Sequence, residues 1–147
     1  MTIKEEKRDL FAIPQGYYLA HCITGDCSLG VGLAKHFDNV YNMRRKLIHR
    51  YGWENIEEDL KGFVGEAFLI DNVFNLVLKK DISKKPKYKK LRRCLLDMAG
   101  QMEDLLITKI AIPKLACGHE GLEWERVRKI IEEVFEDTDV EILVCSL

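Results

Sequence analysis

The chain of 147 residues lacks any long apolar run. A membrane helix needs roughly 20 consecutive apolar residues, so we expect no membrane partner. The first ten residues are charged and lack the apolar centre of a secretory signal. Cys-x-x-Cys pairs are also missing, and the five scattered cysteines are odd in number, which argues against a disulfide framework. The sequence therefore predicts reduced thiols and a cytoplasmic location.

The chain also lacks an excess of positive or negative charge, because 23 Lys and Arg residues are balanced by 24 Asp and Glu residues. The charges are nevertheless segregated along the chain. Residues 79–93 hold nine Lys and Arg against one Asp, whereas residues 119–139 hold eight acidic residues against three basic ones. One basic face or loop suits an anionic ligand. Internal repeats and Gly/Ser linkers are absent, so we expect one domain spanning residues 1–147.

Short apolar segments are typical of buried strands and alternate here with segments of helical periodicity. The expected strands are residues 17–23, 63–70, 73–78, 106–112 and 140–146. Asp71 and Asn72, both turn-forming residues, predict a hairpin between the second and third of these strands. The alternation of strands and helices predicts an α/β fold with a mainly parallel sheet and helices on both faces.

The expected helices are indicated by apolar residues that recur every three or four positions. One helical segment is residues 33–37, and another begins at Pro86, which suits a first helical turn. The three apolar stripes are Val40, Met43, Leu47, Ile48 and Tyr51; then Tyr88, Leu91, Leu95, Met98, Met102 and Leu105; and finally Trp124, Val127, Ile131, Val134 and Phe135.

Two glycine-containing loops each follow a predicted strand and lead into a predicted helix. They are TGDCSLGVG (24–32) and KLACGHEGLEW (114–124). In parallel sheets, ligands lie beyond the carboxyl ends of the strands. Glycines let backbone N–H groups approach a ligand, and a helix N-terminus attracts anions. A glycine also serves simply to make a tight turn. Two such loops at equivalent strand ends, together with the basic segment, favour an anionic ligand.

Three motifs, in the same order along the chain, resemble the macrodomain family, in particular its terminal ADP-ribose protein glycohydrolase branch. They are LAHCITGDCSLGVGLAKHF (19–37), LVLKKDISKKPKY (76–88) and IPKLACGHEGLEWERV (112–127), and the likeness extends from Asp9 to Leu147. Most macrodomains carry Asn-Ala-Ala-Asn where this chain has His21-Cys22-Ile23-Thr24. The resemblance implies a three-layer α/β/α fold with a mixed, mainly parallel sheet of six strands and a cleft for ADP-ribose.

The resemblance also implies which residues bind ADP-ribose. Asp9 would accept a hydrogen bond from the adenine amino group, although Arg8 stands where many relatives have glycine, and a turn cap is the alternative role of Asp9. Residues 28–33 would wrap the diphosphate, and Thr24 would face the distal ribose. The complete implied set is Asp9, Leu10, His21, Thr24, Ser28, Leu29, Gly30, Val31, Gly32, Leu33, Cys117, Gly118, His119, Gly121 and Leu122.

The resemblance further implies a reaction that uses neither a metal nor another cofactor. By this resemblance, Lys79 would attack the anomeric carbon of the distal ribose, and Glu120 would help to release the product. Only a neutral amine is a nucleophile, and the neighbouring lysines favour loss of the Lys79 proton through like-charge repulsion. The branch has aspartate where this chain has Glu120. The longer side chain predicts slower turnover or a longer-lived adduct, while His119 is a candidate to share the proton transfer.

The expected function is therefore an ADP-ribosyl glycohydrolase or ester hydrolase acting on ADP-ribose conjugates. The candidate conjugates are glutamate or aspartate esters of proteins, O-acetyl-ADP-ribose and ADP-ribosylated nucleic-acid bases, so that ADP-ribosylated proteins and DNA are the candidate partners.

One alternative is a non-catalytic ADP-ribose reader. Another is a nucleic-acid-binding module at residues 79–93, where Tyr88 is the single interleaved aromatic residue. A zinc site can be drawn from Cys22, Cys27, Cys117 and His119, but its spacing fits no standard pattern. The three cysteines are better interpreted as small wall residues.

Overall fold

The computed structural model describes residues 1–51 and 60–147, with the backbone alone at Tyr51. Within these residues, six strands form one mixed sheet in the order β1-β6-β5-β2-β4-β3. Every neighbouring pair is parallel except the antiparallel hairpin of β3 and β4. The mainly parallel mixed sheet predicted from the sequence is therefore confirmed. The strands are β1 (Thr2–Lys7), β2 (Tyr18–Thr24), β3 (Ala67–Ile70), β4 (Val73–Lys79), β5 (Lys109–Ile112) and β6 (Glu141–Ser146).

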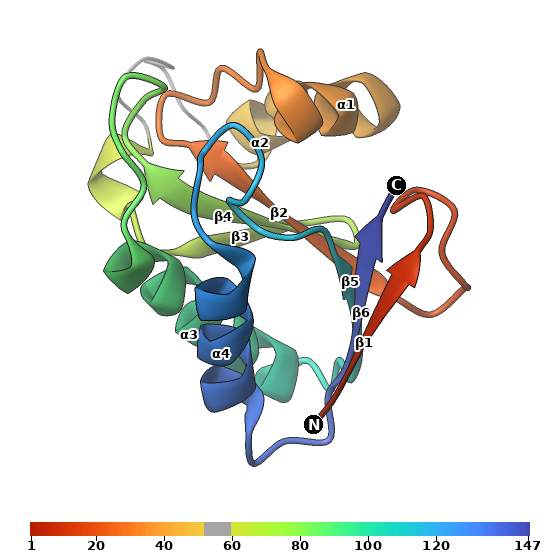
Figure 1. The fold of residues 1–147 in the computed structure, drawn as a ribbon. Helices are drawn as coiled ribbons and strands as arrows, with labels where there is room; N and C mark the ends of the chain where they lie inside the picture. Colours follow the sequence, from red (N-terminus) through yellow and green to blue (C-terminus); the bar gives the residue numbers. More distant parts are fainter. Residues whose placement is uncertain (52–59) are drawn as a thin grey trace.

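Helices cover both faces of the sheet. Helices α3 and α4 lie together on one face, and α1 and α2 lie on the opposite face (Figure 1). The helices of the described part are α1 (Gly32–Tyr41), α2 (Met43–Tyr51), α3 (Tyr88–Asp104) and α4 (Trp124–Phe135), with a 3-10 turn at Lys61–Phe63. This arrangement confirms the three-layer α/β/α fold. None of the described helices is long and apolar enough to cross a membrane.

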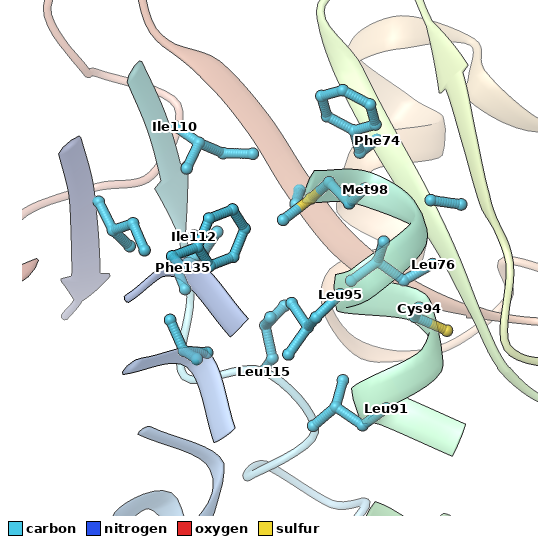
Figure 2. Packing of buried hydrophobic residues seen from close by; sticks show 14 of the residues in the cluster. Phe74, Leu76, Leu91, Cys94, Leu95, Met98, Ile110, Ile112, Leu115 and Phe135 are labelled. Carbon is cyan, nitrogen blue, oxygen red and sulfur yellow. The ribbon is translucent and has the colours of Figure 1, made fainter. Parts of the chain in front are cut away.

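Strand β4 is buried on both faces, which explains its nearly continuous apolar sequence. Its side chains alternate between two hydrophobic clusters. Phe74 and Leu76 join the cluster beneath α3 and α4, whereas Val73 and Val77 join the cluster beneath α1 and α2. Figure 2 shows the first cluster, in which side chains of α3 and α4 meet those of the strands. The two clusters hold the carboxyl end of β4 firmly between the helical layers.

The single helix predicted over residues 40–51 is divided into two. Asn42, between α1 and α2, has a left-handed φ of 55°, and its N–H donates to the Asp38 carbonyl at 2.8 Å. The Asp38 carboxylate accepts a second hydrogen bond from the Arg44 N–H at 2.9 Å. Asparagine tolerates the left-handed conformation that ends a helix. The chain therefore changes direction here, which apolar periodicity alone does not reveal.

This break changes which side chains are buried. Val40 is 53% exposed, so its predicted place in the buried stripe is wrong, whereas Met43 and Leu47 are fully buried. The side chain of Tyr51 lies outside the described residues. The stripe of the next helix is also one residue too long, because α3 ends before Leu105, which is 55% exposed.

Strand β1 was not predicted by periodicity. Its sequence, TIKEEK, contains mostly charged residues, and Ile3 is only half-buried. The strand lies at the edge of the sheet and pairs with β6 alone. Charged side chains are common on edge strands because they discourage pairing with other chains. Backbone pairing rather than an apolar pattern therefore identifies β1. Three predicted boundaries also shift inward: β3 begins at Ala67, α3 at Tyr88 and β5 at Lys109.

Candidate functional site

The two glycine-containing loops lie at the same edge of the sheet. Strands β2 and β5 are parallel neighbours, so the loops that follow them emerge side by side. A cavity of about 230 Å³ is lined by both loops and by the end of β4. The predicted site residues that line it are Thr24, Ser28, Leu29, Gly30, Val31, Leu33, Lys79, Gly118, His119 and Glu120. Cys22 also lines it, as a small wall residue.

The other predicted site residues do not line this cavity; they are Asp9, Leu10, His21, Gly32, Cys117, Gly121 and Leu122. Asp9 is exposed in the loop after β1, and Leu10 is buried beneath it. The Asp9 carboxylate accepts a hydrogen bond from the Phe11 N–H at 2.9 Å. One oxygen of Asp9 thus caps a turn, which is the alternative role that the sequence raised.

A bulge aligns the ends of β2 and β4. The pairing runs regularly to Ile23 opposite Val77, then skips one residue so that Thr24 lies opposite Lys79. Bulges occur frequently next to active sites, where they redirect a side chain. Here the bulge places Lys79 beside the first loop, at the base of the cavity.

The first loop is held in an unusual backbone conformation. Cys27 and Leu29 have left-handed φ values of 55° and 41°. Non-glycine residues rarely adopt this region, and such residues cluster at ligand clamps. The Asp26 carboxylate accepts hydrogen bonds from the Thr24 hydroxyl at 2.6 Å and from the Ser28 N–H at 3.1 Å. Asp26 was not predicted, although an aspartate two residues before a serine in a turn is a recognisable loop-fixing signal.

The second loop makes two closed turns. The Ala116 carbonyl, at a residue with φ of 59°, accepts from the Leu122 N–H at 2.9 Å. The Gly118 carbonyl accepts from the N–H of Gly121, which has φ of 83°. His119 lies within both turns, and a Cβ built on Gly32 would approach its ring to 3.2 Å. The second loop therefore contacts the first loop through the His119 ring.

Lys79 and Glu120, far apart in the sequence, form an ion pair at the base of the cavity. The Lys79 Nζ lies 2.7 Å from Glu120 Oε2, and the side chains are only 7% and 14% exposed. The same Nζ lies 3.5 Å from the Ile82 carbonyl, to which it donates. On its other side, Glu120 Oε1 lies 3.1 Å from His119 Nε2. A buried amine, a carboxylate and an imidazole therefore stand in a row.

The thiols of Cys22 and Cys117, near the ion pair, are not in a reactive form. Burial raises the pKa of Cys22 well above its ordinary value and also raises the pKa of Cys117. Both thiols therefore stay protonated near neutral pH, a form that is neither a good nucleophile nor a metal ligand. Among residues 1–51 and 60–147, no three His, Cys, Asp or Glu side chains are grouped to hold a metal ion. The zinc alternative thus finds no support in the geometry.

His21 is buried and does not line the cavity. Its Nε2 lies 2.6 Å from Asn75 Oδ1, and its ring stacks on Phe37 with centroids 3.9 Å apart. Burial lowers the pKa of His21 to about 4, against an ordinary value of 6.5. The ring is therefore neutral at physiological pH, and it packs against Phe37 of α1.

Several cavity residues were not predicted from the sequence. Ile82, which follows β4, is 54% exposed and forms part of the rim with the exposed side chains of Val31 and Leu33. Lys114 adds a second positive charge to the cavity wall. An apolar residue in an otherwise basic loop is a signal that could have predicted Ile82 as a cavity residue. Lys114 could be predicted as one only from its place at the end of β5.

Three comparisons relate the chain to known proteins. A model of the Macro domain family matches residues 48–131. The ADP-ribose glycohydrolase OARD1 of Bos taurus is 35% identical over 145 residues, which cover 96% of this chain and 89% of that protein. The solved macrodomain of Mycobacterium tuberculosis DarG superposes with a TM-score of 0.80 at 21% identity, covering 99% of this chain and 98% of that one. Thermosipho africanus DarTG in complex with ADP-ribose gives a TM-score of 0.74 at 16% identity, over 98% of this chain and 41% of that chain.

Proposed function

This chain belongs to the macrodomain family, and we propose that it is a hydrolase that removes ADP-ribose from ester conjugates. The observation that carries the proposal is the buried Lys79–Glu120 pair, 2.7 Å apart, at the base of a cavity between two glycine-containing loops. The 35% identity to a protein named ADP-ribose glycohydrolase supports the same activity.

The first loop and the start of α1 suit a diphosphate. Val31 at the N-cap of α1 makes no side-chain cap hydrogen bond, and the first turn contains no acidic residue. The backbone N–H groups at this end are thus available to anions, which the helix dipole also favours. Gly30 and Gly32 keep side chains away from the approaching phosphates. We assign the diphosphate to residues 28–33, the distal ribose to Thr24 and the adenine amino group to Asp9.

The first chemical step forms a covalent adduct. The ammonium of Lys79 transfers a proton from Nζ to Glu120 Oε2, leaving a neutral amine and a carboxylic acid. The amine electron pair attacks the anomeric carbon of the distal ribose, and the carbon–oxygen bond of the ester breaks. The bonding electrons leave with the released carboxylate. The adduct nitrogen carries a positive charge that balances the anionic leaving group, so the proton released to solvent is the one that Glu120 took from Lys79, and its loss makes Glu120 a carboxylate again.

The second step returns the enzyme to its starting state. The oxygen of a water molecule attacks the anomeric carbon while the Glu120 carboxylate takes a proton from that water. The carbon–nitrogen bond to Lys79 breaks. The same proton passes to the departing amine, so that free ADP-ribose and the Lys79 ammonium are formed. Glutamate reaches Lys79 in this chain despite its extra methylene, which supports the assignment of Glu120 to both proton transfers.

A second candidate function is a non-catalytic ADP-ribose reader. The observation in its favour is the ion pair itself, because Glu120 lies 2.7 Å from the Lys79 amine that a hydrolase needs free for attack. A reader would use the same loops to bind ADP-ribose without breaking the ester. Turnover of a conjugate separates the two functions.

The basic segment 79–93 bears on the kind of conjugate. Its single aromatic side chain, Tyr88, is covered by the Arg126 guanidinium 3.9 Å from the ring centroid. The Tyr88 hydroxyl accepts a hydrogen bond from the Glu123 N–H at 2.9 Å. Tyr88 is therefore not free to stack on a base, as single-stranded nucleic acids require. This favours protein esters and O-acetyl-ADP-ribose over nucleic-acid conjugates.

The test is turnover of a panel by the purified protein. The panel contains an ADP-ribosyl-glutamate peptide, O-acetyl-ADP-ribose and an ADP-ribosylated oligonucleotide. We expect release of ADP-ribose from the first two, measured by liquid chromatography. Release from the oligonucleotide alone would overturn the ester assignment. Tight binding of ADP-ribose without release from any conjugate would establish the reader.

A further inference from the structure

The Lys79–Glu120 pair is poorly connected to water. The two side chains are 7% and 14% exposed, and both lie at the base of the cavity. Bound substrate would cover this base further. The first step of the proposed reaction nevertheless releases one proton to solvent. A side chain that reaches both Glu120 and bulk water would provide the missing path.

His119 has both properties. Its Nε2 lies 3.1 Å from Glu120 Oε1, and its side chain is 56% exposed. The ring is held in place by packing over Gly32, where a Cβ would lie 3.2 Å from the ring carbon Cε1 and 3.4 Å from Nδ1. Imidazole is also the side chain that gains and loses a proton near neutral pH. Position, exposure and chemistry thus coincide at one residue.

We propose that His119 is a positioning residue that holds the Glu120 carboxyl group and passes its proton to solvent during turnover. This inference rests on the proposed hydrolase function. After Lys79 has protonated Glu120 Oε2, a half-turn of the carboxyl group brings that oxygen to His119. The neutral ring accepts this proton at Nε2 because it carries its own proton on Nδ1, and the imidazolium then releases the Nδ1 proton to water, which leaves an Nε2–H that can donate to the Glu120 carboxylate. Glu120 is again a carboxylate, ready for the second step.

Within residues 1–51 and 60–147, few charged groups lie near His119. Glu120 neighbours it directly, and Lys79 lies beyond Glu120 at the end of β4. Lys114, at the start of the same loop, lines the same cavity. Helix α1, which the ring touches at Gly32, has no acidic residue in its first turn and carries the exposed Lys35. Among the residues that the structure describes, Glu120 is therefore the acidic group in direct contact with the ring.

The experiment compares two variants of His119. They separate its role in holding the Glu120 carboxyl group from its role in passing the proton to solvent. Glutamine in His119→Gln can still donate to Glu120 but does not titrate, whereas alanine in His119→Ala does neither and leaves room for free imidazole. The measurement is kcat for the ADP-ribosyl-glutamate peptide across neutral and alkaline pH, with and without added imidazole. ADP-ribose affinity is measured in parallel.

Both variants are expected to lose roughly tenfold or more in kcat at neutral pH, within the usual range for proton-transfer catalysis. The loss should shrink as pH rises, because hydroxide then takes the proton directly, and imidazole should restore His119→Ala. Affinity for ADP-ribose should change less than about threefold. Wild-type kcat in His119→Gln would overturn the inference, as would a deficit in both variants that neither pH nor imidazole alters.

Two further variants complete the design. His49→Gln, an exposed histidine of α2 remote from the cavity lining, should keep the wild-type kcat and pH profile. Lys79→Ala tests the proposed function separately. If Lys79→Ala is inactive while His119→Gln matches the wild type, the hydrolase function stands and the role of His119 is wrong.

Discussion

Glu120 is one methylene longer than the aspartate that the resemblance places at its position. It reaches Lys79 at 2.7 Å, so the ground-state geometry accommodates the longer side chain. In Glu120→Gln the Lys79 amine can still lose its proton to water before the substrate binds, whereas the attack of water on the adduct has no base, so a lysyl–ADP-ribose species should accumulate. Intact-protein mass spectrometry would detect the added mass. Glu120→Asp, which keeps the carboxylate, should remain active, and absence of any adduct in Glu120→Gln would contradict the role.

Asp9 is predicted to recognise adenine, although one of its oxygens caps the Phe11 N–H. Asp9→Ala should weaken ADP-ribose binding by about 1.5–3 kcal/mol, the usual value for a hydrogen bond to a charged group. The hypoxanthine analogue of ADP-ribose lacks the amino donor and should bind the wild type weakly. Asp9→Ala, which has lost the carboxylate, should bind the hypoxanthine analogue and ADP-ribose equally well. Calorimetry that shows the same preference for adenine in both proteins would refute the assignment.

At the scale of elements, the loop after β2 depends on a close backbone approach at Gly25. Its N–H donates to the Lys79 carbonyl at 2.8 Å, and a Cβ built on it would lie 2.9 Å from the Lys61 Cα. Gly25→Ala should therefore lower the free energy of unfolding by roughly 1–3 kcal/mol, measured by denaturant titration, because backbone atoms must move. Gly100→Ala, at a helical site of α3 with nothing within 4 Å, should instead stabilise by about 0.5–1 kcal/mol. Equal stability of the two variants would contradict this account.

The predictability of each element depends on where its signal lies. Helices α3 and α4 were predicted because their buried side chains recur at helical spacing. The division at Asn42 was missed, because it depends on one left-handed residue and its contacts with Asp38. Strand β1 was missed because its stability comes from pairing with β6. Local patterns thus predict the elements with buried faces and miss those defined by backbone geometry.

The candidate site was likewise predictable where its signal is local and was missed where it depends on tertiary contacts. The two loops were predicted from glycines after apolar strands, and the structure brings them to one cavity. The partnership of Lys79 and Glu120 followed from resemblance, because no local pattern connects residues so far apart. The bulge between β2 and β4 and the loop-fixing role of Asp26 depend on tertiary contacts. These contacts set the geometry of the site but leave little trace in the sequence.

At the scale of the whole molecule, His21 couples stability to pH. Its pKa is about 4 in the folded protein, because burial disfavours the charged ring, against an ordinary 6.5 in the unfolded chain. The stabilisation from a neutral ring is complete above about pH 6.5 and is lost as pH falls toward 4. The loss from this group is roughly 3 kcal/mol. The free energy of unfolding should thus fall more steeply with acidification in the wild type than in His21→Gln. Parallel curves from urea titrations would contradict this.

The central claim is that this macrodomain breaks an ADP-ribose ester through Lys79, and one pair of measurements on Lys79→Ala tests it most directly. Release of ADP-ribose from an ADP-ribosyl-glutamate peptide and the affinity for free ADP-ribose are measured on the same preparations. We predict that Lys79→Ala loses nearly all turnover while its affinity changes by less than about tenfold, or 1.4 kcal/mol. Lys80→Ala, at the exposed neighbouring residue, should retain most activity. Turnover by Lys79→Ala equal to that of the wild type would contradict the claim.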